Sequence, residues 1–161
     1  AIDTKDLTKA FGWQDSDAFH QQDANELRLK LFEALEKTFQ RKIDDHPLST
    51  NLVDLLFRGR LDNVRKCGGC NFEKKNSEEY LDLNIPVRGA TSIEEGLSLF
   101  LQKEKMEGDN AVFCSNCEKK CDTDMGIEIS TAPIVLTLSL RRFDYDLQTW
   151  MRVKLNHSVS F

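Results

Sequence analysis

The cysteines of this 161-residue chain are the residues whose spacing indicates chemistry most directly. Cys67 and Cys70 form one Cys-x-x-Cys pair, and Cys114 and Cys117 form a second. Two residues between thiolates allow a tight turn to direct both sulfurs at one tetrahedral ion, and the glycines inside the first pair permit such a turn. Because four thiolates leave no open coordination position, the pattern predicts a structural zinc ion that stabilises the fold and does not activate water.

The interval between the two pairs is longer than in a minimal zinc ribbon, so an intervening strand and helix must bring the pairs together across a sheet. Four reduced cysteines without metal, or vestigial pairs, are the alternative interpretation. Cys121 follows Cys117 by four residues and could replace it as a ligand, or it is a spare thiol. A redox role fits poorly, because neither pair begins a helix of a βαβ unit.

A second constellation consists of acids near the start of a predicted helix. Asp23 and Glu26 are three residues apart and would share one helical face. Both would lie in the first turns, where the helix dipole favours carboxylates, and capping alone explains this placement. Paired carboxylates can also perform acid–base chemistry, but no second catalytic feature accompanies them in the sequence.

The composition is that of one globular domain, with 40% hydrophobic and 30% charged residues. The net charge of −5 and the absence of a basic run argue against nucleic-acid binding and favour a basic partner surface. No apolar stretch reaches membrane length, and the first residues lack a signal-peptide pattern. An odd number of cysteines, mostly in close pairs, favours metal over disulfides, and we expect a cytoplasmic or nuclear location.

Apolar periodicity predicts helices in the first part of the chain. Residues 1–21 predict a short helix and a turn, and Gly12 is well placed to end the turn. A stronger helix is predicted over residues 21–40, with an apolar stripe made of Ala24, Leu27, Leu31, Ala34, Leu35 and Phe39. The His46-Pro47 step marks a break, and residues 51–57 predict a further short helix.

The rest of the chain predicts mostly strands. Residues 58–66 lead into the first cysteine pair, and residues 80–85 alternate apolar and polar side chains, as a half-buried strand does. Ser92 and Glu95 form a capping-box pattern that opens a helix through about Gln102. Residues 134–140 predict a central strand, with residues 153–161 as its partner, and the order indicates an α+β fold with a mostly antiparallel sheet.

Three stretches carry a resemblance to a known family: Gln21–Leu27 reads QQDANEL, Glu79–Pro86 reads EYLDLNIP, and Pro133–Phe143 reads PIVLTLSLRRF. They resemble, in order, the QQDAxEF segment, the strand after the first zinc knuckle and the P-x-x-L-x-L-x-L-x-R-F signature of the ubiquitin-specific proteases, the papain-like deubiquitinases. The two cysteine pairs fall where that family's fingers subdomain binds zinc. Phe11-Gly12-Trp13 resembles the branch of the herpesvirus-associated and forty-seventh-numbered human members.

The resemblance implies a hand-like fold of thumb, palm and fingers within one catalytic domain. Residues 1–45 would finish the papain-like thumb, and residues 46–161 would build the fingers and much of the palm, with the zinc ribbon at the fingertips. Gln21, Asp23 and Glu26 would hold the arginine-rich tail of ubiquitin, because carboxylates pair with guanidinium groups through charge-assisted hydrogen bonds. The fingers would support the body of ubiquitin, and residues 144–151 could form a loop over its tail.

The catalytic parts of that family have no counterpart in the chain. Its nucleophile segment, G-x-T-C-Y-x-N, is expected upstream, and its catalytic histidine with the orienting Asp or Asn is expected downstream of Phe161. None of the five cysteines matches the nucleophile, and His20, His46 and His157 lie outside the family's motif. Cysteine-protease chemistry needs thiolate, base and orienter within hydrogen-bond reach, so we expect an inactive internal piece without catalytic residues.

The predicted function is therefore that of the ubiquitin-recognising segment of a deubiquitinating cysteine protease. The parent would hydrolyse the peptide or isopeptide bond after the C-terminal glycine of ubiquitin. Ubiquitin and ubiquitinated proteins are the expected partners, with neither nucleic acid nor membrane among them. The alternative is a non-catalytic zinc-ribbon module that binds ubiquitin or another protein.

Overall fold

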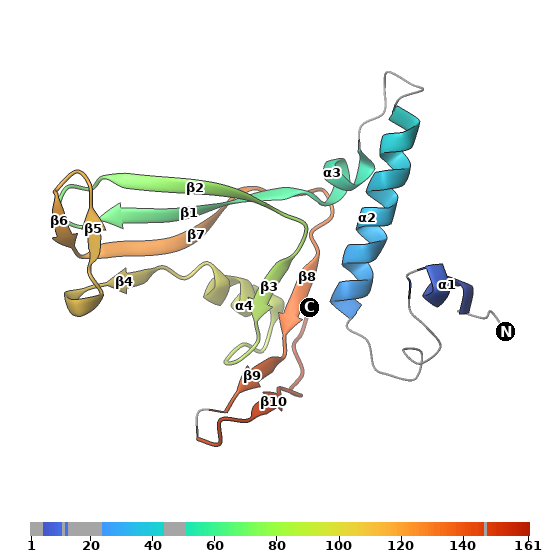
Figure 1. Cartoon of the computed structure of the whole chain (residues 1–161). Coiled ribbons are helices and arrows are strands. Elements are labelled where there is room, and N and C mark those ends of the chain that lie inside the picture. Colours follow the sequence, from blue (N-terminus) through green and yellow to red (C-terminus); the bar gives the residue numbers. More distant parts are fainter. Residues whose placement is uncertain (1–4, 11, 13–23, 44–50, 147) are drawn as a thin grey trace. The chain divides into compact units, whose positions relative to one another are not determined.

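The computed structural model describes residues 5–10, 12, 24–43, 51–146 and 148–161 (Figure 1). The chain forms two compact units, residues 1–56 and residues 57–161, and each is described by itself. Within the described residues, no helix is long and apolar enough to cross a membrane.

The first unit is helical. Helix α1 (Lys5–Ala10) ends at a turn in which the Gly12 N–H donates to the Lys9 carbonyl at 2.9 Å with a φ of 77°, as the position of the glycine predicted. The described part of the predicted long helix is confirmed as α2 (Ala24–Ile43), which continues beyond the predicted end. The short helix α3 (Leu52–Phe57) is also confirmed, and its Val53 N–H donates to the Asn51 side chain at 3.1 Å.

The buried face of α2 is turned by about one residue from the predicted stripe. Phe32, which the stripe omitted, is buried, whereas Leu31 is exposed. Leu27, Leu35 and Phe39 of the predicted stripe are half-buried, and Arg28 is half-buried on the side of Phe32. An aromatic ring removes more apolar surface from water than a leucine side chain does. Burial of Phe32 in place of Leu31 therefore accounts for the difference between the predicted stripe and the buried face of α2.

The second unit contains a four-stranded antiparallel sheet in the order β2-β1-β7-β4. Its strands are β1 (Gly59–Cys67), β2 (Glu73–Tyr80), β4 (Glu104–Met106) and β7 (Thr123–Thr131). The short hairpin of β5 (Val112–Cys114) and β6 (Lys119–Cys121) lies at the end of this sheet where β1 finishes (Figure 1). The predicted α+β class with a mostly antiparallel sheet is therefore confirmed.

Two further pairs of strands complete the second unit. Strand β3 (Leu83–Pro86) pairs in parallel with β8 (Leu138–Arg141), and β9 (Phe143–Tyr145) pairs antiparallel with β10 (Arg152–Lys154). Helix α4 (Ile93–Phe100) packs against β3. Together α4 and the strands bury the apolar core, whose central residues are Leu61, Tyr80, Leu83, Ile85 and Ile93.

The capping pattern that opens α4 is confirmed, with one difference. The Ser92 hydroxyl accepts from the Glu95 N–H at 3.2 Å, as predicted. The Glu95 carboxylate reaches one residue further back than the pattern predicts and accepts from the Thr91 N–H at 2.6 Å. The helix ends at Phe100 rather than near Gln102.

The prediction of one continuous strand over residues 80–85 is wrong in its extent. Strand β2 ends at Tyr80, the chain bends, and β3 begins at Leu83. Strand β2 itself, with the sequence EKKNSEEY, was not predicted, because seven of its eight residues are exposed and no apolar alternation marks it. As the edge strand of the sheet it needs only backbone pairing with β1.

The predicted central strand and its partner are wrong as well. Of the predicted stretch, only residues 138–140 are a strand, as part of β8, and within the described residues β8 pairs with β3. Ile134 before it is 71% exposed. Strand β10 pairs locally with β9 rather than with β8, because the intervening turn closes on itself through the Trp150 N–H and the Asp146 carbonyl at 2.8 Å. β-Branched composition predicts a strand only where a pairing partner is available.

Candidate metal centre

Four cysteine sulfurs converge at the end of the long sheet. Cys67 ends β1 and Cys70 lies in the turn that follows, while Cys114 ends β5 and Cys117 lies in the turn before β6. All four Sγ atoms lie within 4.8 Å of one another, with Cys67 and Cys117 3.9 Å apart and Cys70 and Cys114 3.7 Å apart. The structure thus brings together the four cysteines that the sequence analysis selected, and the group could hold a metal ion.

Backbone hydrogen bonds around the first pair explain this convergence. The Cys67 N–H donates to the Phe72 carbonyl, and the Asn71 N–H donates to the Cys67 carbonyl, each at 2.9 Å. The Gly68 N–H donates to the Asp122 carbonyl at 2.8 Å and so ties this turn to the segment after β6. A Cβ atom on Gly68 would stand 3.1 Å from that carbonyl oxygen, so the close approach favours glycine here.

Donors around the sulfurs favour thiolates at the first pair. The Cys70 N–H is the main cause that lowers the pKa of the Cys67 thiol to about 6, against the opposing effect of burial. The Asn116 side chain is the main cause that lowers the pKa of Cys70. The Cys70 sulfur, and after it burial, raises the pKa of Cys117. Four thiolates at this spacing repel one another, so a cation is needed to hold all four deprotonated.

Cys121 borders the four-sulfur group without belonging to it. A Cβ atom on Gly69 would lie 3.4 Å from the Cys121 sulfur and 3.6 Å from the Cys117 sulfur, so the fifth thiol stands beside the set. Its side chain is buried, and burial raises its pKa, which favours the neutral thiol. This environment agrees with the interpretation of Cys121 as a spare thiol.

Of the predicted ubiquitin-binding residues, Gln21 and Asp23 lie outside the described residues. Glu26 lies in the first turn of α2 and is exposed, and its Oε1 is 3.1 Å from the Lys30 Nζ. A surface pair one helical turn apart is weak, so the carboxylate remains available to a partner cation. The binding role of the three residues stays a prediction.

Of the three histidines, His157 lies within the described residues, and backbone carbonyls surround its ring nitrogen. Its Nε2 lies 2.9 Å from the Val87 carbonyl and 3.1 Å from the Ala90 carbonyl. A ring nitrogen satisfied by backbone carbonyls holds two segments together and activates no thiol, as expected for an ordinary polar residue. His20 and His46 lie outside the described residues.

The sequence analysis missed Asn116 and Asp122 as supports of the sulfur group. Asn116 lies between the second pair of cysteines, and a side-chain amide in that place can donate to a neighbouring thiolate. Asp122 contributes its backbone carbonyl, which no side-chain pattern signals. A polar residue inside a Cys-x-x-Cys turn is the only sequence signal that could have identified either support.

These features define an α+β protein with a four-cysteine ribbon at the end of an antiparallel sheet. The chain matches the family model described as ubiquitin carboxyl-terminal hydrolase over residues 1–161, and it belongs to that family. The resemblance in the sequence analysis is thereby confirmed.

Individual relatives specify the branch. Ubiquitin carboxyl-terminal hydrolase 47 of Drosophila melanogaster is 41% identical over 100% of this chain and 10% of that protein, and its Homo sapiens counterpart is 36% identical over 100% and 12%. Ubiquitin carboxyl-terminal hydrolase 5 of Schizosaccharomyces pombe is 32% identical over 99% of the chain and 14% of that protein. The relatives numbered 47 confirm the predicted branch, and the chain spans about a tenth to a seventh of these relatives.

A solved structure supports the same assignment. The SAGA Ubp8/Sgf11/Sus1/Sgf73 DUB module bound to ubiquitin aldehyde contains a chain that matches this one with a TM-score of 0.77 and 25% identity. The match covers 95% of this chain and 34% of that chain. The described fold is therefore one that occurs in a deubiquitinating module.

Proposed function

We propose that this chain is the ubiquitin-recognising segment of a deubiquitinating cysteine protease. The observation that carries the proposal is the family match over all 161 residues, together with a structural relative that is bound to ubiquitin aldehyde. The parent protein hydrolyses the peptide or isopeptide bond after the C-terminal glycine of ubiquitin. The segment alone is inactive, because its sequence matches neither the nucleophile segment nor the histidine segment of the family.

Two parts of the chain contribute to recognition. Residues 1–45 finish the thumb, and residues 46–161 form the fingers and much of the palm. The compact units of the structure divide between residues 56 and 57, eleven residues after this proposed boundary. Gln21, Asp23 and Glu26 hold the basic tail of ubiquitin, and the exposed carboxylate of Glu26 supports this assignment.

The metal at the four-cysteine group is a zinc ion. Zinc–thiolate bonds of about 2.3 Å in a tetrahedron place sulfur atoms about 3.8 Å apart. The separations of 3.9 Å between Cys67 and Cys117 and 3.7 Å between Cys70 and Cys114 match that edge length, and the other sulfur pairs lie within 4.8 Å. With four thiolates the ion supplies cross-linking and no bound water, so it stabilises the end of the fingers. Cysteines that bind zinc rather than form disulfides suit a reducing compartment, which supports the proposed cytoplasmic or nuclear location.

Ubiquitin joined through its C-terminal glycine to a small fluorescent peptide tests recognition and catalysis in one sample. Binding to the zinc-loaded chain should raise the fluorescence polarisation, and no fluorophore should be released. Release of the fluorophore by the purified chain would contradict the inactive segment. Polarisation that stays at the value of free ubiquitin, at chain concentrations up to about 1 mM, would contradict recognition, since weaker binding provides less than about 4 kcal/mol.

A further inference from the structure

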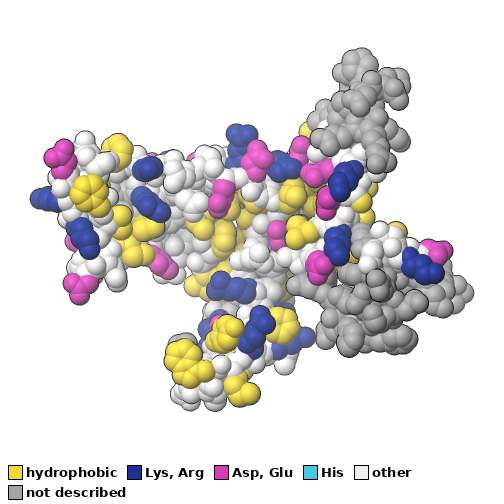
Figure 2. All heavy atoms as spheres, viewed as in Figure 1, with side chains coloured by type: hydrophobic (Ala, Val, Ile, Leu, Met, Phe, Trp, Pro, Cys, Tyr) yellow, Lys and Arg dark blue, Asp and Glu magenta, His cyan; other side chains and the backbone are white. Residues whose placement is uncertain are grey.

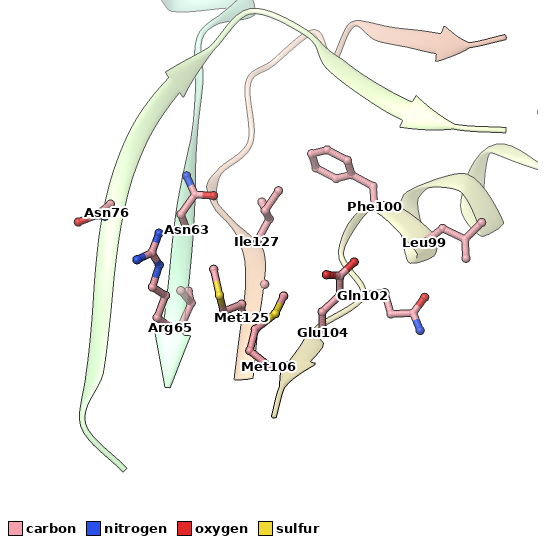
Figure 3. Close-up of a pocket in the computed structure, with 12 residues that line it drawn as sticks. Asn63, Arg65, Asn76, Leu99, Phe100, Gln102, Glu104, Met106, Met125 and Ile127 are labelled. Atoms are coloured by element: carbon pink, nitrogen blue, oxygen red, sulfur yellow. The ribbon is translucent and has the colours of Figure 1, made fainter. Parts of the chain in front are cut away.

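One face of the long sheet carries two adjoining hollows. The larger, of about 380 Å3, lies where α4 ends, and its apolar side is formed by Phe100, Met106, Met125 and Ile127. Figure 3 shows these side chains gathered with Asn63 and Arg65 around one space, from α4, β4, β7 and β1. The smaller, of about 190 Å3, lies between Phe72, Val112 and Phe113. Arg65 lines both hollows, so they adjoin at this side chain, and the two together are called the groove.

Two cations face each other in the middle of this groove. Arg65 on β1 is directly opposite Lys74 on β2, and Lys74 lines the smaller hollow. Like charges directly opposite on neighbouring strands destabilise a sheet. Both side chains are exposed, and within the described residues neither forms an ion pair. The sheet thus keeps an unfavourable pair that a carboxylate between the two would relieve.

The neighbouring charges on the same strands are arranged differently. Lys75 is 2.9 Å from Glu128 and also contacts Glu73, and Lys103 is 2.8 Å from the same Glu128. Because side chains alternate between the two faces of a strand, Lys75 lies on the face opposite Lys74. Lys75 and Lys103 are thus neutralised within the described part of the chain, whereas the two cations of the groove are not.

Apolar side chains flank the cation pair on both sides. Phe72 and Phe113 are 46% and 64% exposed, respectively, although large apolar side chains gain by burial. Figure 2 shows apolar side chains beside basic ones at the end of the sheet where β5 and β6 lie. An exposed apolar patch rimmed by polar groups marks a binding surface.

Glu104 at the far edge of the larger hollow restricts the charge of a partner. It lies on β4, opposite Met125, which in turn is opposite Arg65. A run of acids would therefore meet repulsion at Glu104, whereas a single acid at the cation pair would not. The amides of Asn63 and Asn76 line the same hollow and can bind a peptide backbone.

We propose that this groove binds an extended protein segment in which one acidic residue is flanked by apolar residues two positions away on each side. The acidic side chain pairs with Arg65 and Lys74, one apolar side chain enters the larger hollow, and the other contacts Phe72 and Phe113. Residues two apart in an extended segment are about 7 Å apart and point to the same side, which suits hollows on both sides of Arg65. The inference is independent of ubiquitin recognition.

Fluorescence anisotropy of the zinc-loaded chain with a labelled peptide tests the proposal. The probe has the core Phe-Ser-Asp-Ser-Leu between Gly-Ser flanks, and a second probe carries Asn in place of Asp. The Asp peptide should bind about tenfold tighter than the Asn peptide at low salt, and Arg65→Ala should abolish the difference. Lys66→Ala is the matched control, because Lys66 is the adjacent exposed cation of β1 and points to the opposite face.

The outcomes are distinct. A preference for Asp that survives Lys66→Ala and is lost in Arg65→Ala supports the groove. Equal binding of the two peptides, or equal effects of the two substitutions, overturns it. Saturating unlabelled ubiquitin should leave the peptide bound; displacement by ubiquitin would overturn a separate partner. Failure of ubiquitin to bind at all would contradict the proposed function and would leave the groove proposal unchanged.

Discussion

The hydrogen-bond donors around each cysteine sulfur determine which thiols lose their protons readily. Backbone and amide donors favour thiolates at Cys67 and Cys70, whereas proximity to Cys70 raises the pKa of Cys117. An ion resolves this conflict by replacing protons, because zinc binds thiolates and releases the protons of the thiols. The fifth sulfur, of Cys121, stays neutral at the border of the group.

This arrangement predicts one zinc ion per chain and a difference between two cysteines. Elemental analysis of purified, never chelated chain should give about one zinc per chain. Cys67→Ser should lose most of the metal, because Cys67 is in the four-sulfur group, and Cys121→Ser should retain it. Equal metal loss in both variants, or a chain that contains no zinc, would contradict the assignment of ligands.

The acids near the start of α2 give a second prediction at this scale. Asp23→Arg or Glu26→Arg should weaken ubiquitin binding about tenfold, because a charge-assisted pair with a basic tail is replaced by repulsion. Glu33→Arg is the matched control, since Glu33 is an exposed acid on the same helix with its own lysine partner. Calorimetric titration measures the three affinities, and a loss as large in Glu33→Arg would remove the specific role of Asp23 and Glu26.

The candidate site could be predicted from sequence to the extent that it depends on spacing. Two Cys-x-x-Cys pairs determine which sulfurs can meet, and the structure places those four together. The supports could not be predicted, because the Asp122 carbonyl reaches Gly68 only through the fold. The groove around Arg65 could not be predicted from the sequence for the same reason, since strand register alone places Lys74 opposite Arg65.

Among the elements, those with a local signal could be predicted and those fixed by pairing could not. The capping box of Ser92 and Glu95 determines the start of α4 from four consecutive residues. Strand β2 has no such signal, because it is an exposed edge strand that pairs with β1 through its backbone. The parallel pairing of β3 with β8 joins distant segments, and neither segment encodes its direction.

The junction of α4 with β3 should contribute most to the stability of the second unit. Ile85 is fully buried there, so Ile85→Ala should lower the free energy of unfolding by about 2–5 kcal/mol. Ile134→Ala removes the same atoms from an exposed position and should change it by less than about 0.5 kcal/mol. Urea unfolding of the zinc-loaded variants gives both values. Similar losses for the two isoleucines would contradict this core.

Glu128 connects strands of the long sheet, and its effect should depend on pH. Hydrogen bonds from Lys103 and then Lys75 lower the pKa of Glu128 from its ordinary value of 4.5 to about 2. A lowered pKa in the folded state stabilises the fold above the unfolded pKa, and this contribution disappears as pH falls from about 4.5 to about 2. Because the pair is exposed, the effect is modest and weakens in salt.

Thermal unfolding of the wild-type chain and Glu128→Gln measures that dependence. The wild-type chain should melt higher than the variant at pH 6, and the two melting temperatures should converge as the pH approaches 2. A difference that is constant across this range would mean that the charge of Glu128 is not the source of the effect. Glu107→Gln is the control, because Glu107 forms a single exposed pair with Lys105.

At the scale of the whole molecule, the two units carry different chemistry. The first carries exposed acids on α2, and the second carries a sheet closed by the sulfur group. An acidic chain with a net charge of −5 attracts a basic partner over distance, and local contacts then select it. The family resemblance implies ubiquitin as the partner, and the arginine-rich tail of ubiquitin meets that description.

Calorimetric titration of the zinc-loaded chain with intact ubiquitin and with ubiquitin lacking its C-terminal tail tests the central claim most directly. Intact ubiquitin should bind, and tail-less ubiquitin should bind at least about tenfold more weakly, because it loses the charge-assisted contacts with Asp23 and Glu26. Equal affinity for the two forms, or no heat with either form at concentrations up to about 1 mM, would contradict a segment that recognises ubiquitin through its tail.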